Sequence, residues 1–130
     1  MKILEGKRGL IFGALDEKSI AWKVAQNAHD QGAKFVLSNA PIALRMGKIN
    51  ELAEKTGSRV IPADATSVDD LNNLFEESVK LLGGKLDFVL QIAPTCPFVK
   101  KETYEKIISL LKKGNDCVVT LKRIEHEHPY

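Results

Sequence analysis

The sequence predicts a doubly wound α/β fold, a single domain spanning residues 1–130 and built around a parallel sheet. Short apolar runs alternate with amphipathic stretches along the whole chain, which is typical of repeated βα units. A glycine follows each amphipathic stretch, where the C-terminal cap of a helix is expected. With 44% hydrophobic and 28% charged residues, 130 residues suffice for one domain with its own core.

Hydrophobic periodicity predicts five strands and four helices. The strands are expected near residues 8–13, 34–38, 58–62, 86–92 and 116–122. The helices are expected near residues 18–31, 42–56, 67–82 and 100–113. The face assigned to the second helix consists of Ile42, Met46, Ile49 and Ala53. The candidate N-cap residues are Ser67 and either Asp16 or Ser19.

Right-handed crossovers between parallel strands favour the strand order 3-2-1-4-5, which makes the fold Rossmann-like. In this order the sheet reverses direction between the first and fourth strands. The loops after Gly13 and Ile92 then border one crevice at the carboxyl edge of the sheet. Because doubly wound sheets bind small molecules in this crevice, the sequence predicts its binding site there.

Composition and charge exclude several classes of function. The formal net charge is only +2, and the basic residues are scattered, so we expect no nucleic-acid partner. No apolar run approaches the length of a membrane span, and the start "MKILEGKRG" does not read as a signal peptide. We therefore expect a cytoplasmic protein that does not bind membranes. Cys96 and Cys117 have no CxxC spacing and predict no metal site.

The stretch "GLIFGALDEKSIAWKVAQ", residues 9–26, turns from a strand into a helix at Gly13. Backbone N–H groups at a helix N-terminus can bind a phosphate, and a glycine allows close approach of the ligand. The same residues would also serve a plain turn. Trp22, early in this helix, is expected to pack in the core.

Residues 1 to about 90 resemble the N-terminal part of an enoyl-acyl carrier protein reductase of the short-chain dehydrogenase superfamily. The segments that carry the resemblance are "LEGKRGLIFG", "KSIAW", "NAPIALRMGKINELAEKTGS", "VIPADATSVDDLNNLFEES" and "GGKLDFVL". The resemblance implies dinucleotide contacts from Gly13 and Ala14, pyrophosphate contacts from Ser19 and Ile20, and an adenine border made by Asp64 and Ala65. The alternative assigns Gly13 to the turn, Ser19 to a helix cap and Asp64 to a loop cap.

Two departures from this family bear on activity. Ser38 and Asn39 stand where a carboxylate would read a ribose hydroxyl, so NAD is not distinguished from NADP. The resemblance places a catalytic tyrosine and lysine, separated by six residues, well beyond the fifth strand. No such pair is present, since Leu111 occupies the position where the lysine that pairs with Tyr104 would stand. We therefore expect no catalytic residues and no enzymatic activity.

Residues 91–130 resemble a second family, the sugar cytidylyltransferases of the acylneuraminate type. The match depends on Pro94–Phe98 and on the later "DCVVT". Ala93 replaces the glutamine that would contact the base, and the phosphate loop and metal-binding aspartate of that family are absent. The tail histidines, His126 and His128, are too few for a structural zinc site.

Two families that meet near residues 85–98 predict an engineered chimera, a non-catalytic scaffold that requires no cofactor. A natural truncated homologue is the competing origin. The alternative function is a binding module that retains weak NAD(H) affinity through the turn at Gly13–Ile20. A truncated enoyl-acyl carrier protein reductase is the third hypothesis. The oligomeric state is left open.

Overall fold

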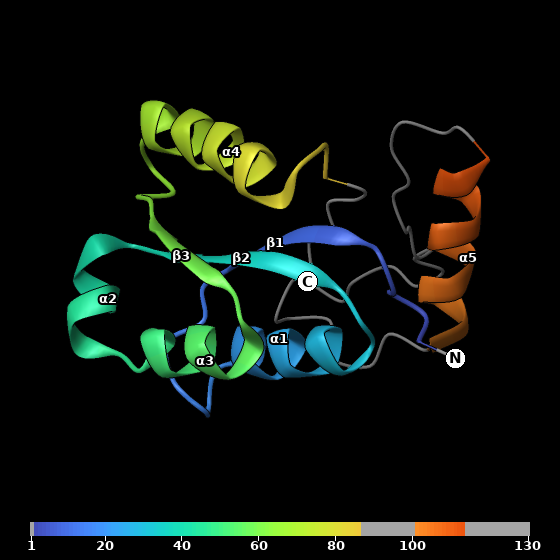
Figure 1. Ribbon diagram of the computed structural model, residues 1–130, viewed down its shortest axis with the longest axis horizontal. Coiled ribbons are helices and arrows are strands. Elements are labelled where there is room, and N and C mark those ends of the chain that lie inside the picture. Colours follow the sequence, from blue (N-terminus) through green and yellow to red (C-terminus); the bar gives the residue numbers. More distant parts are fainter. Residues whose placement is uncertain (1, 87–100, 114–130) are drawn as a thin grey trace, which may run out of the picture. The chain divides into compact units, whose positions relative to one another are not determined.

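The structure is a computed structural model that describes residues 2–86 and 101–113. The chain divides into two compact units, Met1–Leu90 and Gln91–Tyr130. The first unit holds a parallel sheet with helices on both faces (Figure 1). In the second unit the described element is α5, Lys101–Lys112, which confirms the helix predicted over 100–113.

Three parallel strands form the described sheet. They are β1 (Arg8–Phe12), β2 (Lys34–Asn39) and β3 (Arg59–Pro62), in the order β1-β2-β3. These strands and their order confirm one half of the predicted sheet. The strand predicted over 116–122 lies outside the described residues, as does the one over 86–92 apart from Leu86, which is in no strand. The described sheet thus has three strands rather than five, and the full order stays a prediction.

The first unit has four helices among its described residues. They are α1 (Ile20–Asp30), α2 (Pro41–Met46), α3 (Ile49–Thr56) and α4 (Val68–Leu82). Helices α1 and α3 lie on one face of the sheet and α4 lies on the other (Figure 1). The helices predicted over 18–31 and 67–82 are confirmed, with ends that differ by no more than two residues.

The single helix predicted over 42–56 is wrong, because the chain forms α2 and α3 instead. The helix is interrupted at Gly47, whose backbone is extended with φ −105° and ψ 178°. At this break the Lys48 N–H donates a hydrogen bond to the Leu15 carbonyl over 2.8 Å. A contact with a segment distant in sequence therefore replaces the helical bonds that the periodicity predicted.

The apolar face predicted for this segment is wrong for the same reason. Ile42 and Met46 on α2 are 68% and 81% exposed, whereas Ile49 and Ala53 on α3 are buried. Periodicity assumes one continuous helix axis, and the break at Gly47 turns the two halves onto different axes. The second half of the segment therefore supplies its buried core residues, whereas α2 adds Leu44, which is partly buried against the core.

The core lies between the sheet and helices α1 and α3. The cluster of buried side chains is Ala14, Trp22, Ala25, Phe35, Leu37, Ile49, Leu52 and Ala53. Trp22 has no exposed surface, which confirms that it is a packing residue. Ser67 caps α4 as predicted, since its hydroxyl accepts from the Asp70 N–H over 3.2 Å. Within the described ranges, no helix has the length and apolar character needed to cross a membrane.

Candidate functional site

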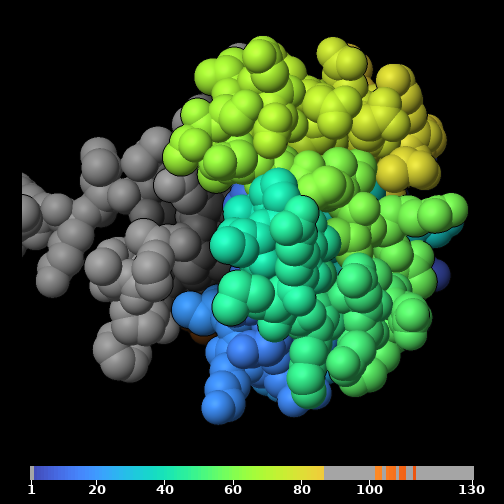
Figure 2. All heavy atoms as spheres, turned by 90° about the vertical axis from the view of Figure 1, so that its left-hand side faces the viewer, coloured from blue at the N-terminus to red at the C-terminus, as the bar shows by residue number. Residues whose placement is uncertain are grey.

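The carboxyl edge of the sheet carries the candidate site. The chain leaves β1 at Gly13, leaves β2 at Ala40 and leaves β3 at Ala63, so the three following segments meet at this edge. Figure 2 faces this edge, with α2 in the centre, the blue turn after β1 beside it and the start of α4 above. The fold thus forms the Gly13 side of the predicted crevice, whereas its other border, the loop after Ile92, lies outside the described residues. We call residues 13–19 the β1–α1 turn.

Three successive residues of the β1–α1 turn are held by other parts of the chain. The Gly13 N–H donates to the Ser38 carbonyl over 2.8 Å. The Ala14 carbonyl accepts from Nδ2 of Asn39 over 3.0 Å. The Leu15 carbonyl accepts from the Lys48 N–H at the α2–α3 break. Since tethered backbone loses little further entropy on binding, the turn is preorganised for a ligand.

Gly13 leaves its side of the turn open. Its φ of +95° lies in the left-handed region that favours glycine. A methyl group built on Gly13 would meet no atom within 4 Å among the residues that the structure describes. The space on this side of the Gly13 backbone is therefore not filled by these residues, and close approach of a dinucleotide requires such space.

Ser19 occupies the N-cap position of α1, but its side chain makes no capping bond. Its hydroxyl donates to the Asp16 carbonyl over 2.7 Å and accepts from the Leu15 N–H over 3.2 Å. Both bonds stay inside the turn, so the hydroxyl stabilises the turn itself. The hydroxyl therefore does not cap the helix, and its predicted pyrophosphate contact stays a prediction.

The start of α1 offers backbone donors. The first N–H groups of a helix lack partners within the helix. Those of Ile20 and Ala21 have no acceptor among the residues that the structure describes. Ile20 is 64% exposed. Free donors at the positive end of the helix dipole make this an anion-binding position.

Ala14 contributes through its backbone alone. Its side chain is 0% exposed and belongs to the core cluster beneath the sheet edge. Its small methyl group lets the turn lie directly on the core. A ligand at this edge would therefore meet the backbone around Ala14 and not its side chain.

Asp64 and Ala65 follow β3 at the same edge, and both are exposed. Oδ1 of Asp64 accepts from the Thr66 N–H over 2.8 Å and from the Thr66 hydroxyl over 2.7 Å. These two bonds hold the pKa of the Asp64 carboxyl below its ordinary value, and the bond from the backbone N–H has the larger effect. Oδ2 has no partner in the described part of the chain. One oxygen thus caps the loop, and the other remains an open acceptor.

The polar residues at the end of β2 are not arranged to read a ribose. Asn39 donates to the Ala14 carbonyl, and its Oδ1 accepts from the Ala40 N–H over 2.8 Å. Ser38 is 0% exposed, and its hydroxyl has no partner in the described structure. Asn39 therefore positions the β1–α1 turn, a role that sequence reasoning missed. The Gly47–Lys48 break was also missed, although a glycine inside a helical pattern was the signal for it.

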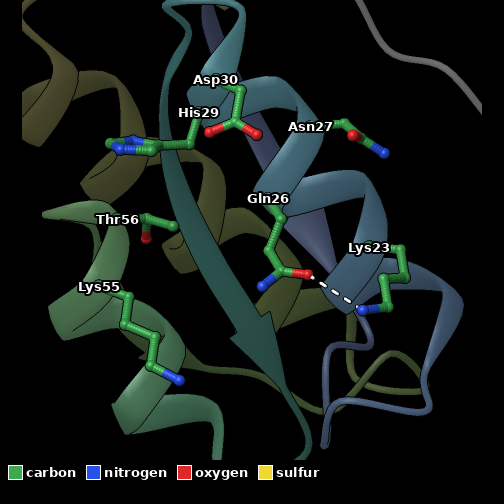
Figure 3. Close-up of a pocket in the computed structure, with 7 residues that line it drawn as sticks. All are labelled: Lys23, Gln26, Asn27, His29, Asp30, Lys55 and Thr56. Carbon is green, nitrogen blue, oxygen red and sulfur yellow. Dashed lines mark hydrogen bonds between the residues drawn. The ribbon is translucent and has the colours of Figure 1, made fainter.

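Two hollows lie elsewhere on the first unit. The hollow in Figure 3, of about 450 Å³, is lined by Lys23, Gln26, Asn27, His29, Asp30, Lys55 and Thr56 from α1 and α3. Nζ of Lys23 donates to the Gln26 side chain over 3.4 Å, and Nζ of Lys55 lies 5.9 Å from the centre of the Trp22 ring. A second hollow of about 540 Å³ includes the starts of β2 and β3. Neither is lined by a predicted cofactor-binding residue.

Within residues 2–86 and 101–113, no group of three or more His, Cys, Asp or Glu side chains is placed to hold a metal ion.

Comparison with known proteins places this edge in a family context. A family model described as enoyl-(acyl carrier protein) reductase matches residues 13–111. The crystal structure of the FabI–NADH complex from Alistipes finegoldii is 52% identical, with a TM-score of 0.68 over 72% of this chain and 34% of that one. The enoyl-acyl carrier protein reductase (NADH) FabI of Aquifex aeolicus is 31% identical over 115 residues, 88% of this chain and 41% of the relative. That of Bacillus cereus is 35% identical over 79 residues, 58% of this chain and 30% of the relative.

These matches correct one prediction and confirm another. The expectation that the chain is not an enzyme is wrong, because the family that it matches consists of reductases. The expectation depended on a missing tyrosine and lysine, and the chain spans only 30 to 41% of the length of these curated relatives. The resemblance of the first part to these reductases, and with it the Rossmann-like α/β fold, is confirmed. The chain belongs to the enoyl-(acyl carrier protein) reductase family.

Proposed function

We propose that the chain binds NADH at the β1–α1 turn and forms the dinucleotide-binding part of an enoyl-acyl carrier protein reductase. The observation that carries this proposal is the exposed N-terminus of α1, where Ile20 and Ala21 present free N–H groups beside the open Gly13. Such an arrangement binds the phosphates of a dinucleotide. The Alistipes finegoldii relative was crystallised as a complex with NADH.

Each part of the edge has a distinct role in this proposal. The N–H groups at the start of α1 bind the pyrophosphate, and Gly13 lets the dinucleotide approach the backbone. The free Oδ2 of Asp64 accepts a hydrogen bond from the adenine amino group, beside Ala65. The core packing of Ala14 and the internal bonds of Ser19 keep the turn in place. When bound, NADH supplies the hydride that the reduction of an enoyl thioester needs.

The proposal makes an unusual prediction about charge at residue 20. Ile20→Glu places a carboxylate at the first position of α1, where the helix dipole favours negative charge, so we expect unchanged or slightly higher stability. The same carboxylate repels the pyrophosphate, so we expect NADH affinity to fall by at least about tenfold. Calorimetric titration with NADH and urea unfolding of the full chain measure the two effects.

Ile20→Gln is the matched control, since it has the size of glutamate without the charge. We expect it to bind NADH within about twofold of the wild type, a difference well below 1 kcal/mol. Equal NADH affinity for the two variants would contradict the placement of the pyrophosphate at this helix. The same pair tests activity in an assay of NADH oxidation with an enoyl thioester. Turnover by Ile20→Gln and the wild type but not by Ile20→Glu would support the reductase function.

The origin of the chain by recombination is a separate proposal. The boundary between the two compact units, at Leu90 and Gln91, falls inside the predicted junction at 85–98, which supports it. The reductase match continues to residue 111, which weighs against it. A comparison restricted to residues 91–130 tests this origin. A cytidylyltransferase match would support recombination, and a reductase match would contradict it.

A further inference from the structure

We infer that Gly47, which follows the β1–α1 turn by about 30 residues in the sequence, is a positioning residue for that turn. Its lack of a side chain lets the α2–α3 break lie directly against Leu15. The inference rests on the proposed NADH site, because it assigns to Gly47 the placement of the backbone that binds the cofactor. Nothing in the helical pattern of residues 42–56 points to this role.

The contact is made by backbone atoms on both sides. The Lys48 N–H donates to the Leu15 carbonyl over 2.8 Å, directly after Gly47. The Gly47 N–H in turn donates to the Ala43 carbonyl over 2.8 Å, which ends α2. The α2–α3 break is thus fixed to its own helix on one side and to the turn on the other. Figure 2 shows the blue atoms of the turn directly below those of α2.

A methyl group at Gly47 has no room. It would lie 2.6 Å from Cδ1 of Leu15, 2.7 Å from the Leu15 carbonyl oxygen and 2.9 Å from the Ala43 carbonyl oxygen. The Leu15 side chain is partly exposed and can rotate away. The two carbonyl oxygens belong to the backbone, so relief requires that the turn and the break move apart.

Backbone conformation does not explain the glycine. The φ of Gly47 is −105°, a value that any residue adopts, so alanine there would be unstrained in isolation. The requirement for glycine is therefore steric and is directed at Leu15 of the turn. Displacement of Leu15 would also displace Gly13 and Ala14, which precede it and whose own tethers are 2.8 and 3.0 Å long.

The test compares Gly47→Ala with Gly9→Ala in the full chain. Gly9 lies in β1, and within the described ranges a methyl group there meets Cβ of Phe35 alone, at the ordinary distance of 3.9 Å. We expect Gly47→Ala to shift the amide signals of residues 13–19 and to weaken NADH binding by about tenfold or more. We expect Gly9→Ala to leave both unchanged. Urea unfolding of each variant shows whether the loss of affinity exceeds any loss of folded protein.

The outcomes separate this inference from the proposed function. If the wild type binds NADH and Gly47→Ala binds it with equal affinity, the role of Gly47 is overturned and the proposed NADH site is not. Absence of NADH binding by the wild type would overturn both. If Gly47→Ala does not fold, Lys48→Pro replaces it, because proline removes the N–H that holds the Leu15 carbonyl. Unchanged affinity in a folded Lys48→Pro variant would then contradict the inference.

Discussion

The Ser19 hydroxyl uses its hydrogen bonds on Asp16 and Leu15, within the turn that precedes α1. Sequence reasoning identified Ser19 but not these partners, because spacing along a chain does not show which way a hydroxyl points. We propose that the turn binds its ligand instead through backbone N–H groups, which every residue except proline carries. A sequence therefore reveals such donors only through the helix start that exposes them.

The structure predicts a shifted pKa for the carboxyl of Asp64, a residue of the candidate site. The Thr66 N–H and hydroxyl lower the pKa of its carboxyl below the ordinary value. Thr66→Ala removes the hydroxyl and keeps the backbone bond, so we expect the Asp64 pKa to rise part of the way back. A carboxyl-detected NMR titration of both proteins measures the two values. Equal pKa values would contradict the hydrogen bond from the Thr66 hydroxyl.

The sign of the effect on stability follows from linkage. Because the carboxyl has a lower pKa in the folded state than in the unfolded chain, its contribution is fully present above the unfolded pKa. It is lost as the pH falls through the folded pKa. The stability difference between wild type and Thr66→Ala should therefore shrink in acid and be constant near neutral pH. A difference that grows in acid would contradict this cause.

At the scale of elements, the N-terminal cap of α4 offers a simple test of a feature predicted from nearby residues alone. Ser67, its N-cap, accepts from the Asp70 N–H and also lies 3.2 Å from the Asp70 carboxylate, whose other oxygen accepts from the Asp64 N–H. We expect Ser67→Ala to lower the free energy of unfolding by about 1 kcal/mol, as urea unfolding will measure. Ser67→Asp keeps a capping oxygen and should lose less than Ser67→Ala. Equal losses for the two variants would contradict the cap.

Elements with local causes were predicted well, and those with distant causes were not. Strand β2, helix α4 and its cap follow from periodicity and N-cap chemistry within a few residues of sequence. The division of residues 42–56 into α2 and α3 depends on Leu15, which no local pattern includes. The same tertiary contact positions the candidate site. The sheet edge that carries the candidate site could therefore be predicted from the sequence, whereas the contact that holds its turn in place could not.

At the scale of the whole molecule, family membership changes the meaning of the missing catalytic pair. The prediction of an inactive scaffold depended on the absence of that pair. The curated relatives are reductases of which this chain spans 30 to 41%. The described unit carries the sheet edge at which we propose that the phosphates of NADH bind. Its central proposed property is therefore NADH binding, to which each feature of the turn contributes.

NADH titration of the isotope-labelled full chain, followed through the amide signals of Gly13, Ser19 and Asp64, tests this claim most directly. We expect saturable shifts at these three residues and at Ile20, because they surround the proposed site. Residues of the hollow between α1 and α3, such as His29, should not shift. A dispersed spectrum that does not change with NADH would show a folded domain without the cofactor site and would contradict the proposed function.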